Sequence, residues 1–368
     1  MRVLFALSGL HRVRRGAEVA FESIGEALAE SGVDVTLLGS GPPVDGRSYR
    51  YKGTRVVPRE RFERAPSLPP VLRSEYVYEE LTFVPGMVRH IRPRDYDVTV
   101  TCGYPYTNWV LRALGGRRRP RHVFVTQNGD WPARENRREF RLFGCDGLVC
   151  TNPGYFEANR DRWRCALIPN GVDPDRFRPG PPERERFGLD ADRPVVLMVS
   201  ALIASKRVAE AVSVVSRCPD VMLVVAGDGP ERDAIDEQAA RELPGRFRRL
   251  VVDPAEMPAL YRSVDALLHM SIDEPFGNAY IEAGACGVPV VGHRTASTEW
   301  ILGTDGHLVD TNDFDSVADT LQAVIAAPAA DVAERSSRFH ERFGWPTVAA
   351  QYREFLEEVV REDGALGS

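Results

Sequence analysis

Lysine is almost absent from this sequence. Only Lys52 and Lys206 occur among its 47 basic residues, and arginine fills every other basic position. We attribute this to the coding bias of the source genome. A lysine kept against that bias indicates a position that needs a compact ammonium group where a planar guanidinium would not fit. Lys206 is therefore a candidate functional residue.

Long apolar runs and cysteine motifs are also missing. No stretch of about 18 apolar residues occurs, which excludes a transmembrane helix. The six cysteines are scattered without a CxxC pair, which argues against a zinc site or a disulfide framework and for reduced thiols. We expect Met1–Leu7 to form a first strand, not a signal peptide. The expected location is the cytoplasm, with the inner face of the membrane as an added option.

Charge is unevenly divided along the chain. Residues 1–172 hold 27 basic and 19 acidic side chains, a balance of +8, whereas the remainder holds 20 and 34, a balance of −14. The basic half suits an anionic partner such as a phosphate, an acidic sugar or a membrane surface, with a solvated basic surface as an equal alternative. The basic clusters at 117–121 and 134–141 accompany no nucleic-acid motif, so no nucleic acid partner is expected.

Short apolar runs alternate with amphipathic segments along the chain, whose 368 residues exceed one ordinary core. We predict strands at 3–7, 33–38, 97–101, 122–126, 147–150, 195–200, 221–226, 250–252, 266–269 and 288–291. We predict helices at 17–30, 79–90, 107–114, 136–143, 207–215, 231–243, 255–262, 278–285, 296–301 and from 314. This alternation predicts doubly wound parallel sheets. Residues 168–179, with three prolines and an Asn-Gly pair, are typical of an interdomain linker.

Two glutamates eight positions apart mark the most informative stretch. Glu274 precedes a Pro-Phe-Gly turn, and Glu282 lies inside the helix predicted to start near Asn278, four positions after that residue. A loop carboxylate and a helix carboxylate can point into one cleft from different heights. Such a pair suits a polyhydroxylated ligand, because each carboxylate accepts several hydroxyl hydrogen bonds. Two solvated helix charges are the alternative.

With other motifs, these glutamates resemble the retaining glycosyltransferases of family 4. The shared motifs lie in order over residues 1–310 and are Gly16-Ala-Glu18, Ile168–Asp173, Ser200–Arg207, Gly227-Asp-Gly-Pro230, Ala259–Ala266 and Glu274–Glu282. The resemblance implies an α/β fold of GT-B architecture, with two Rossmann-like doubly wound parallel-sheet domains facing a central cleft. The N-terminal acceptor domain would comprise 1–172 and an amphipathic C-terminal helix at about 343–368. The nucleotide-sugar donor domain would comprise 173–342.

The resemblance also implies roles for residues of the second domain. Glu274 would hold hydroxyls of the donor sugar, Glu282 would bind the ribose, and Lys206 would neutralise the departing diphosphate. The backbone amides of Phe276, Gly277 and Asn278 would meet the sugar and diphosphate at a helix N-terminus, where free N–H groups and the helix dipole favour an anion. The further substrate-binding candidates on this side are Gly227 and Glu299.

The first domain and the phosphate site depart from the family pattern. Gly16 would let the first loop approach the phosphates closely. The family usually has Gly-Arg-Leu before the lysine, but this chain has Ser-Ala-Leu at 200–202 and lacks that arginine. Arg207, Arg14 and Arg15 are the candidate replacements.

A histidine that many relatives have near position 127 is also absent. The chain has Gln127, Asn128 and Asp130 there, which we take as candidates for contact with the acceptor or the reacting sugar, Asp130 as a catalytic residue. A plain Asn-Gly turn with a capping aspartate is an equal alternative. His11 in the first loop is equally ambiguous.

The implied reaction is a hexosyl transfer, with retention, from a nucleotide-diphosphate sugar to an acceptor hydroxyl. The acceptor would be a glycolipid, a polysaccharide or a natural product, and peripheral contact with an anionic membrane is an added expectation. No Asp-x-Asp follows a suitable strand. We therefore expect no cofactor and no essential metal. A phosphorylase on the same fold and a catalytically silent nucleotide-sugar-binding subunit are the alternatives.

Overall fold

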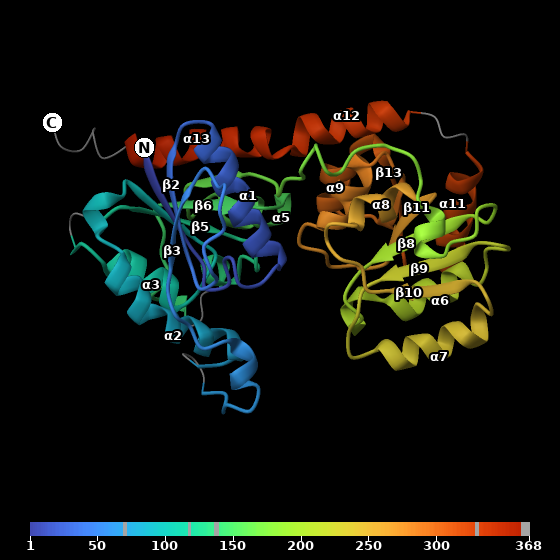
Figure 1. Cartoon of the computed structure of the whole chain (residues 1–368), viewed down its shortest axis with the longest axis horizontal. Coiled ribbons are helices and arrows are strands. Elements are labelled where there is room, and N and C mark those ends of the chain that lie inside the picture. The colour runs from blue at the N-terminus through green and yellow to red at the C-terminus, as the bar shows by residue number, and fades with distance from the viewer. Residues whose placement is uncertain (69–71, 117–118, 136–139, 328–330, 362–368) are drawn as a thin grey trace. The chain divides into compact units, whose positions relative to one another are not determined.

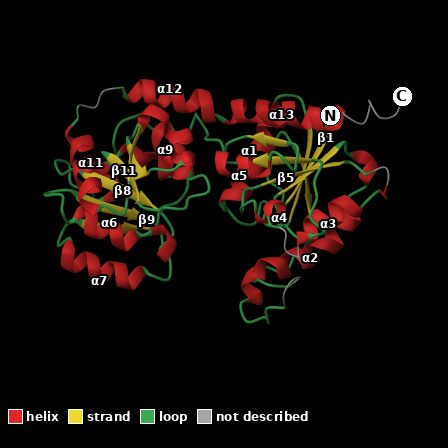
Figure 2. Cartoon of the chain, turned by 180° about the vertical axis from the view of Figure 1, so that it is seen from behind, coloured by secondary structure: helices red, strands yellow, loops and turns green. Residues whose placement is uncertain are grey.

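The computed structural model describes residues 1–68, 72–116, 119–135, 140–327 and 331–361 (Figure 1). These residues form two compact units. The first contains Met1–Gly171 and the C-terminal segment from Trp345, and the second contains Val172–Gly344. In each unit, helices cover both faces of a parallel sheet (Figure 2). The predicted α/β class is confirmed.

The first unit is built on a sheet that has seven strands in the described residues, in the order β3-β2-β1-β4-β5-β6-β7. Its strands are β1 Arg2–Ala6, β2 Asp34–Gly39, β3 Arg50–Gly53, β4 Val98–Thr101, β5 Arg121–Val125, β6 Gly147–Cys150 and β7 Cys165–Leu167. Its helices are α1 Gly16–Glu30, α2 Glu75–His90, α3 Tyr106–Ala113, α4 Trp131–Arg134, α5 Pro153–Asn159 and α13 Trp345–Arg361. The strand order reverses between β1 and β4, the place where doubly wound sheets bind ligands.

The last helix, α13, belongs to this first unit. Its buried residues recur at helical spacing, and Tyr352 and Leu356 lie in the same hydrophobic cluster as Phe5 of β1 and Ile24 of α1. A Cβ at Gly147 would lie 2.9 Å from the ring of Phe355, so the strand β6 also packs tightly against α13. The amphipathic pattern at the end of the chain is thus accounted for by burial on the first sheet.

The second unit has a sheet with six strands in the described residues, in the order β10-β9-β8-β11-β12-β13. Its strands are β8 Val195–Val199, β9 Met222–Ala226, β10 Phe247–Leu250, β11 Ala266–His269, β12 Val290–His293 and β13 Gly306–Val309. Its helices are α6 Val208–Val215, α7 Arg232–Glu242, α8 Met257–Arg262, α9 Asn278–Ala285, α10 Ala296–Leu302, α11 Phe314–Ala326 and α12 Val332–Phe343. Helix α12 packs on α9, where the missing side chain of Gly284 leaves room for the ring of Phe339.

Several sequence predictions are corrected by the structure. The strand predicted at 250–252 is β10 at Phe247–Leu250, and α2 begins four residues before the predicted start at 79. The elements β3, β7, β13, α4, α5 and α12 were not predicted individually. Of the predicted helix at 136–143, residues 136–139 lie outside the described residues, as do Arg117, Arg118 and the end of the chain from 362.

Two expectations from the sequence, that no transmembrane helix and no disulfide framework is present, can be compared with the described residues. No helix among them is both long and apolar enough to cross a membrane. All six cysteines are described and are unpaired.

Candidate active site

Three polar side chains meet at the carboxyl edge of the second sheet. Lys206 ends a short 3-10 helix after β8, His269 is the last residue of β11, and Glu274 lies in the loop before α9. Nζ of Lys206 lies 2.5 Å from Oε2 of Glu274, and Nε2 of His269 lies 3.3 Å from the same oxygen. The structure therefore joins the predicted lysine and the first predicted glutamate, and it adds a histidine to them.

Glu274 is held in its ionised form. Burial raises the pKa of its carboxyl, but the hydrogen bonds and charges of His269 and Lys206 outweigh this effect and place the net pKa below the ordinary value. Both contacts fall on Oε2. Within the described residues no hydrogen bond is made to Oε1, so this oxygen can accept hydrogen bonds from ligand hydroxyl groups.

His269 was not identified from the sequence. Its side chain is buried, and its ring packs edge-on against Tyr280 with the centroids 4.8 Å apart. Among the described residues, neither Nδ1 of His269 nor the hydroxyl of Tyr280 has a hydrogen-bond partner, although both atoms are buried. Because buried polar atoms are normally paired, these two mark the surroundings of Glu274 as a place for water or a ligand. The available signal was a histidine closing the apolar run Ala-Leu-Leu-His.

The start of α9 depends on Gly277. Its φ is +81°, and a Cβ there would lie 2.5 Å from the ring of Tyr280 and 3.1 Å from Cγ of Glu274. Only glycine can therefore lead into the helix at this point. The side chain of Phe276 is buried and packs against Trp300, so only its backbone can meet a ligand. The first turn of α9 begins at Asn278, beside Glu274.

Glu282 lies on α9, one turn beyond its first residues. The hydroxyl of Tyr261 in α8 donates to Oε2 of Glu282 at 2.8 Å. Burial raises the pKa of Glu282 to about 7, against the opposing effects of this hydrogen bond and of Arg176. The two predicted glutamates thus differ in charge state, since Glu274 is ionised at neutral pH and Glu282 is poised to titrate there.

Gly227 joins the loops that follow β8 and β9. A Cβ at this position would lie 1.8 Å from the carbonyl oxygen of Ser200, so glycine is required for the two backbones to meet. The N–H of Leu202 donates to the carbonyl of Asp228 at 3.0 Å. The Gly-Asp-Gly segment therefore supports the loop that leads to Lys206. Gly227 thus has a packing role in addition to the binding role that was predicted for it.

Arg207 and Glu299, two other predicted residues of the second unit, each bond to protein groups. The guanidinium of Arg207 donates to the carbonyl of Met270 at 3.1 Å and to Oγ1 of Thr311 at 2.9 Å. These bonds favour a structural role, and its predicted role as a replacement phosphate cation is not tested by them. Glu299 in α10 is exposed and pairs with Arg294 at 3.0 Å.

The predicted residues of the first unit lie between β1 and α1, at the start of α1, and after β5. Gly16 is the first residue of α1, and Nη2 of Arg15 lies 3.2 Å from Glu60. Nε2 of Gln127 donates to Oδ1 of Asn170 at 2.5 Å.

The neighbours of Gln127 and the first-loop histidine have internal partners. Asn128 lies 3.9 Å from Sγ of Cys102. Asp130 is buried and accepts a hydrogen bond from Asn159 at 2.9 Å, which makes a structural role the better supported interpretation. His11 bonds the hydroxyl of Tyr49 at 2.7 Å.

Comparisons with known proteins identify the family of the chain. The family model for Glycosyltransferase Family 4 matches residues 14–176, and the model for Glycosyl transferases group 1 matches residues 181–363. The lipopolysaccharide core biosynthesis glycosyltransferase LpsE of Rhizobium meliloti is 28% identical over 319 residues, covering 84% of this chain and 86% of that protein. A D-inositol 3-phosphate glycosyltransferase of Xylanimonas cellulosilytica is 34% identical over 54% of this chain and 52% of its own length, so there the chain spans about half of the relative.

Solved structures show the same fold. Sucrose-phosphate synthase from Thermosynechococcus elongatus has a TM-score of 0.77 at 19% identity, covering 97% of this chain and 98% of that one. HepE from Anabaena, solved with UDP and glucose, has a TM-score of 0.74 at 20% identity, covering 97% and 99%. The fold is therefore GT-B. Because the two family models follow each other over nearly the whole sequence, the chain belongs to the family 4 glycosyltransferases, with a glycosyl transferases group 1 domain as its C-terminal half.

Proposed function

We propose that this glycosyltransferase moves a sugar from a nucleotide-diphosphate sugar to an acceptor hydroxyl, with retention of the anomeric configuration. The observation that carries the proposal is the meeting of Lys206 and His269 on one oxygen of Glu274, directly before the start of α9. A cation, an anchored carboxylate and a helix N-terminus are the groups that a sugar diphosphate needs. HepE of Anabaena, solved with UDP-glucose, supports a donor of this class.

The donor would be held by groups before the start of α9 and by Glu282 in its middle. Glu282 would accept hydrogen bonds from the ribose hydroxyls, and the free oxygen of Glu274 would accept them from the sugar. The backbone N–H groups at the start of α9 would meet the diphosphate, because the helix dipole favours an anion there. His269 would act as a positioning residue that fixes the carboxylate of Glu274 for the sugar.

In the transfer step, the bond between the anomeric carbon and the phosphate oxygen breaks and a bond to the acceptor oxygen forms on the same face. The acceptor proton passes to the departing phosphate oxygen, so the products are a retained glycoside and a nucleoside diphosphate. Lys206 would turn from Glu274 to the phosphate as negative charge develops there. Preorganised groups of this kind are each worth about 10²–10³ in rate. In this proposal Lys206 and the helix provide the positive charge without a metal.

The test is nucleotide release from a panel of UDP-, GDP-, ADP- and dTDP-sugars, with and without EDTA, followed by NMR assignment of the anomer formed. We expect release from one donor class, unchanged by EDTA, and a product with the configuration of the donor. An inverted product would contradict retention, and loss of activity in EDTA would contradict metal independence. Release of a sugar phosphate that depends on added phosphate would instead indicate a phosphorylase.

A further inference from the structure

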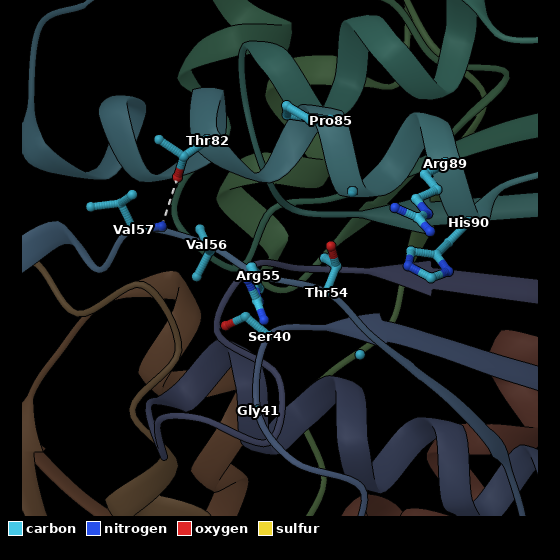
Figure 3. A pocket seen from close by; sticks show the side chains of 12 residues that line it. Ser40, Gly41, Thr54, Arg55, Val56, Val57, Thr82, Pro85, Arg89 and His90 are labelled. Atoms are coloured by element: carbon cyan, nitrogen blue, oxygen red, sulfur yellow. Dashed lines mark hydrogen bonds between the residues drawn. The ribbon is translucent and has the colours of Figure 1, made fainter.

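A pocket of about 1030 Å³ lies in the first unit, and none of the candidate residues described above lines it (Figure 3). One wall is made by Ser40 and Gly41, directly after β2, and by residues 53–57, at and after the end of β3. The other wall is the second half of α2, from Thr82 to His90. The pocket therefore begins at the carboxyl ends of two parallel strands, the edge at which doubly wound sheets bind ligands.

The segment after β3 is anchored to both neighbours of the pocket. The N–H of Thr54 donates to the carbonyl of Gly39 at 2.9 Å, and the N–H of Val57 donates to Oγ1 of Thr82 at 3.0 Å, the dashed line in Figure 3. A Cβ at Gly86 would lie 1.8 Å from Oγ1 of Thr54, so glycine is required for α2 to approach this segment. The walls are thus fixed by backbone bonds and close packing.

The charge that lines the pocket has one sign. Arg55 comes from one wall and Arg89 and His90 come from the other, and no carboxylate lines the pocket. Neither guanidinium has an ion pair or hydrogen bond within the described part of the chain. The adjacent Arg50 and Arg59, by contrast, pair with Asp34 and Glu79.

Favourable interaction with the dipole of α2 accounts for the positions of Arg89 and His90 but not for that of Arg55. Arg89 and His90 lie in the last turn of α2, where cations are favourable. However, Nζ of Lys52 already donates to the carbonyl of His90 at 3.1 Å. Arg55 is exposed and lies outside the helix, on the opposite wall, so the helix dipole does not account for it.

Apolar side chains adjoin the cationic ones. Val56, Val57 and Pro85 line the pocket, and Val57 is among the exposed large hydrophobic residues of the chain. A ligand with a phosphate-type anion next to a less polar portion would match both features.

We propose that this pocket binds a phosphate monoester or diester, with Arg55 and Arg89 as its paired ligands and His90 beside them. Arginine suits this task because its planar fork donates two parallel hydrogen bonds to phosphate oxygens. A lipid head group and a soluble sugar phosphate carry the same chemistry. Binding of the anion does not require the transfer reaction, whereas its use as a handle on the acceptor rests on the proposed function.

The experiment measures binding to the full chain by titration calorimetry and by vesicle co-sedimentation. The soluble probes are inorganic phosphate and glycerol 3-phosphate, at constant ionic strength in chloride. The vesicles contain phosphatidic acid in phosphatidylcholine, or phosphatidylcholine alone. We compare the wild type with the double variant Arg55→Gln/Arg89→Gln. The control is Arg160→Gln/Arg162→Gln, which removes the same charge from the surface of the same unit.

We expect saturable binding in at least one arm, weaker by about tenfold or more in the double variant and unchanged in the control, because the double variant loses charge-assisted hydrogen bonds and a tenfold loss corresponds to only about 1.4 kcal/mol in total. Binding of glycerol 3-phosphate that is tighter than binding of inorganic phosphate identifies a soluble phosphate ester, and binding to anionic vesicles alone identifies a lipid. No saturable binding in either arm, or equal weakening in the control, would overturn the proposal. Donor hydrolysis without acceptor should be unaffected in the double variant, so a failure of the pocket is distinguishable from a failure of the proposed function.

Discussion

Nζ of Lys206 and Oε2 of Glu274 lie 2.5 Å apart, although 68 positions separate the two residues in the sequence. The contact joins the loop after β8 to the loop before α9, and it leaves the ammonium beside the helix N-terminus. The side chains are 24% and 14% exposed, so a ligand can reach the pair while most of the solvent is kept away. We therefore expect this pair to matter more for the reaction than for folding.

Replacing Lys206 with alanine should lower the rate of nucleotide release by about 10²–10³-fold, because the departing diphosphate loses its cation. Steady-state kinetics with the active donor check this, with thermal unfolding to show that the variant is folded. Arg217→Ala is the matched control, since it removes a cation from an exposed ion pair with Asp315 in the same unit. Wild-type rates in Lys206→Ala would refute the assignment.

His269→Leu should raise the donor KM by about tenfold, because Glu274 loses a hydrogen bond and its carboxylate is less well oriented. The affinity for the free nucleoside diphosphate should stay constant, since no sugar is present. His269→Gln, which keeps a donor group, should recover part of the loss. If His269 has only a structural role, His269→Leu should instead unfold at a lower temperature. The ratio of the donor KM to the dissociation constant of the free nucleoside diphosphate should then stay unchanged.

Nucleotide affinity should fall as the pH falls through about 7. Burial raises the pKa of Glu282 to about 7, and below this pH the protonated carboxyl accepts ribose hydrogen bonds less well. Titration calorimetry at a series of pH values around neutrality tests this. Glu282→Gln should bind weakly with little pH dependence over the same range. A wild-type affinity that is constant, or that rises toward acid, would rule out the ribose role.

Glu80→Gln should stabilise the protein above neutral pH. Glu80 is 1% exposed, and burial raises its pKa to about 7. A raised carboxyl pKa means that the folded state holds the proton more tightly than the unfolded state. The contribution of protonated Glu80 to the free energy of unfolding is therefore fully present below about pH 4.3. It is lost as the pH rises through 7, and this loss lowers the free energy of unfolding by on the order of 3 kcal/mol.

Urea unfolding at acid and alkaline pH measures this effect. The free energy of unfolding should exceed that of the wild type only at the alkaline end. Glu30→Gln, an exposed carboxylate at the end of α1, is the control and should change neither value. A Glu80→Gln variant that is less stable than the wild type at alkaline pH would show that the ionised form is well compensated.

Gly277→Ala should be more damaging than Gly245→Ala, although both glycines have positive φ. Gly245 has φ +69° and nothing within 4 Å of an added Cβ, so its substitution should cost only about 1–2 kcal/mol of backbone strain. At Gly277 the Cβ also meets Tyr280 and Glu274, which should add about 1–3 kcal/mol and weaken donor binding. Urea unfolding and nucleotide-sugar titration check both effects, and equal losses in the two variants would show that only the backbone matters.

The fold was predictable where the hydrophobic pattern is strong. Strand β11 at Ala266–His269 was predicted at its observed bounds because a short apolar run is bounded by polar residues. Strand β10 was misplaced because Phe-Arg-Arg-Leu is an edge strand whose charged side chains hide the apolar signal. The predicted strand was shifted toward Val251, which is exposed in the structure.

The site was only partly predictable, because its parts meet through tertiary structure. The spacing of motifs indicated Lys206 and Glu274, but not that His269 would contact the same oxygen. Arg207 follows Lys206 in sequence, yet its left-handed conformation, with φ +56°, accompanies bonds from its side chain to Met270 and Thr311. Adjacency in sequence was therefore a poor guide to adjacency in the site.

The most direct test of the central claim is the thermal stabilisation of the full chain by UDP, GDP, ADP and dTDP and their sugars. A nucleotide at 100 times its dissociation constant should raise the free energy of unfolding by about 2.7 kcal/mol. We predict a shift with one nucleotide class, a larger shift with its sugar conjugate at equal concentration, and loss of both in Glu282→Ala. No shift with any nucleotide, or an equal shift in Glu282→Ala, would contradict a donor site on the second unit.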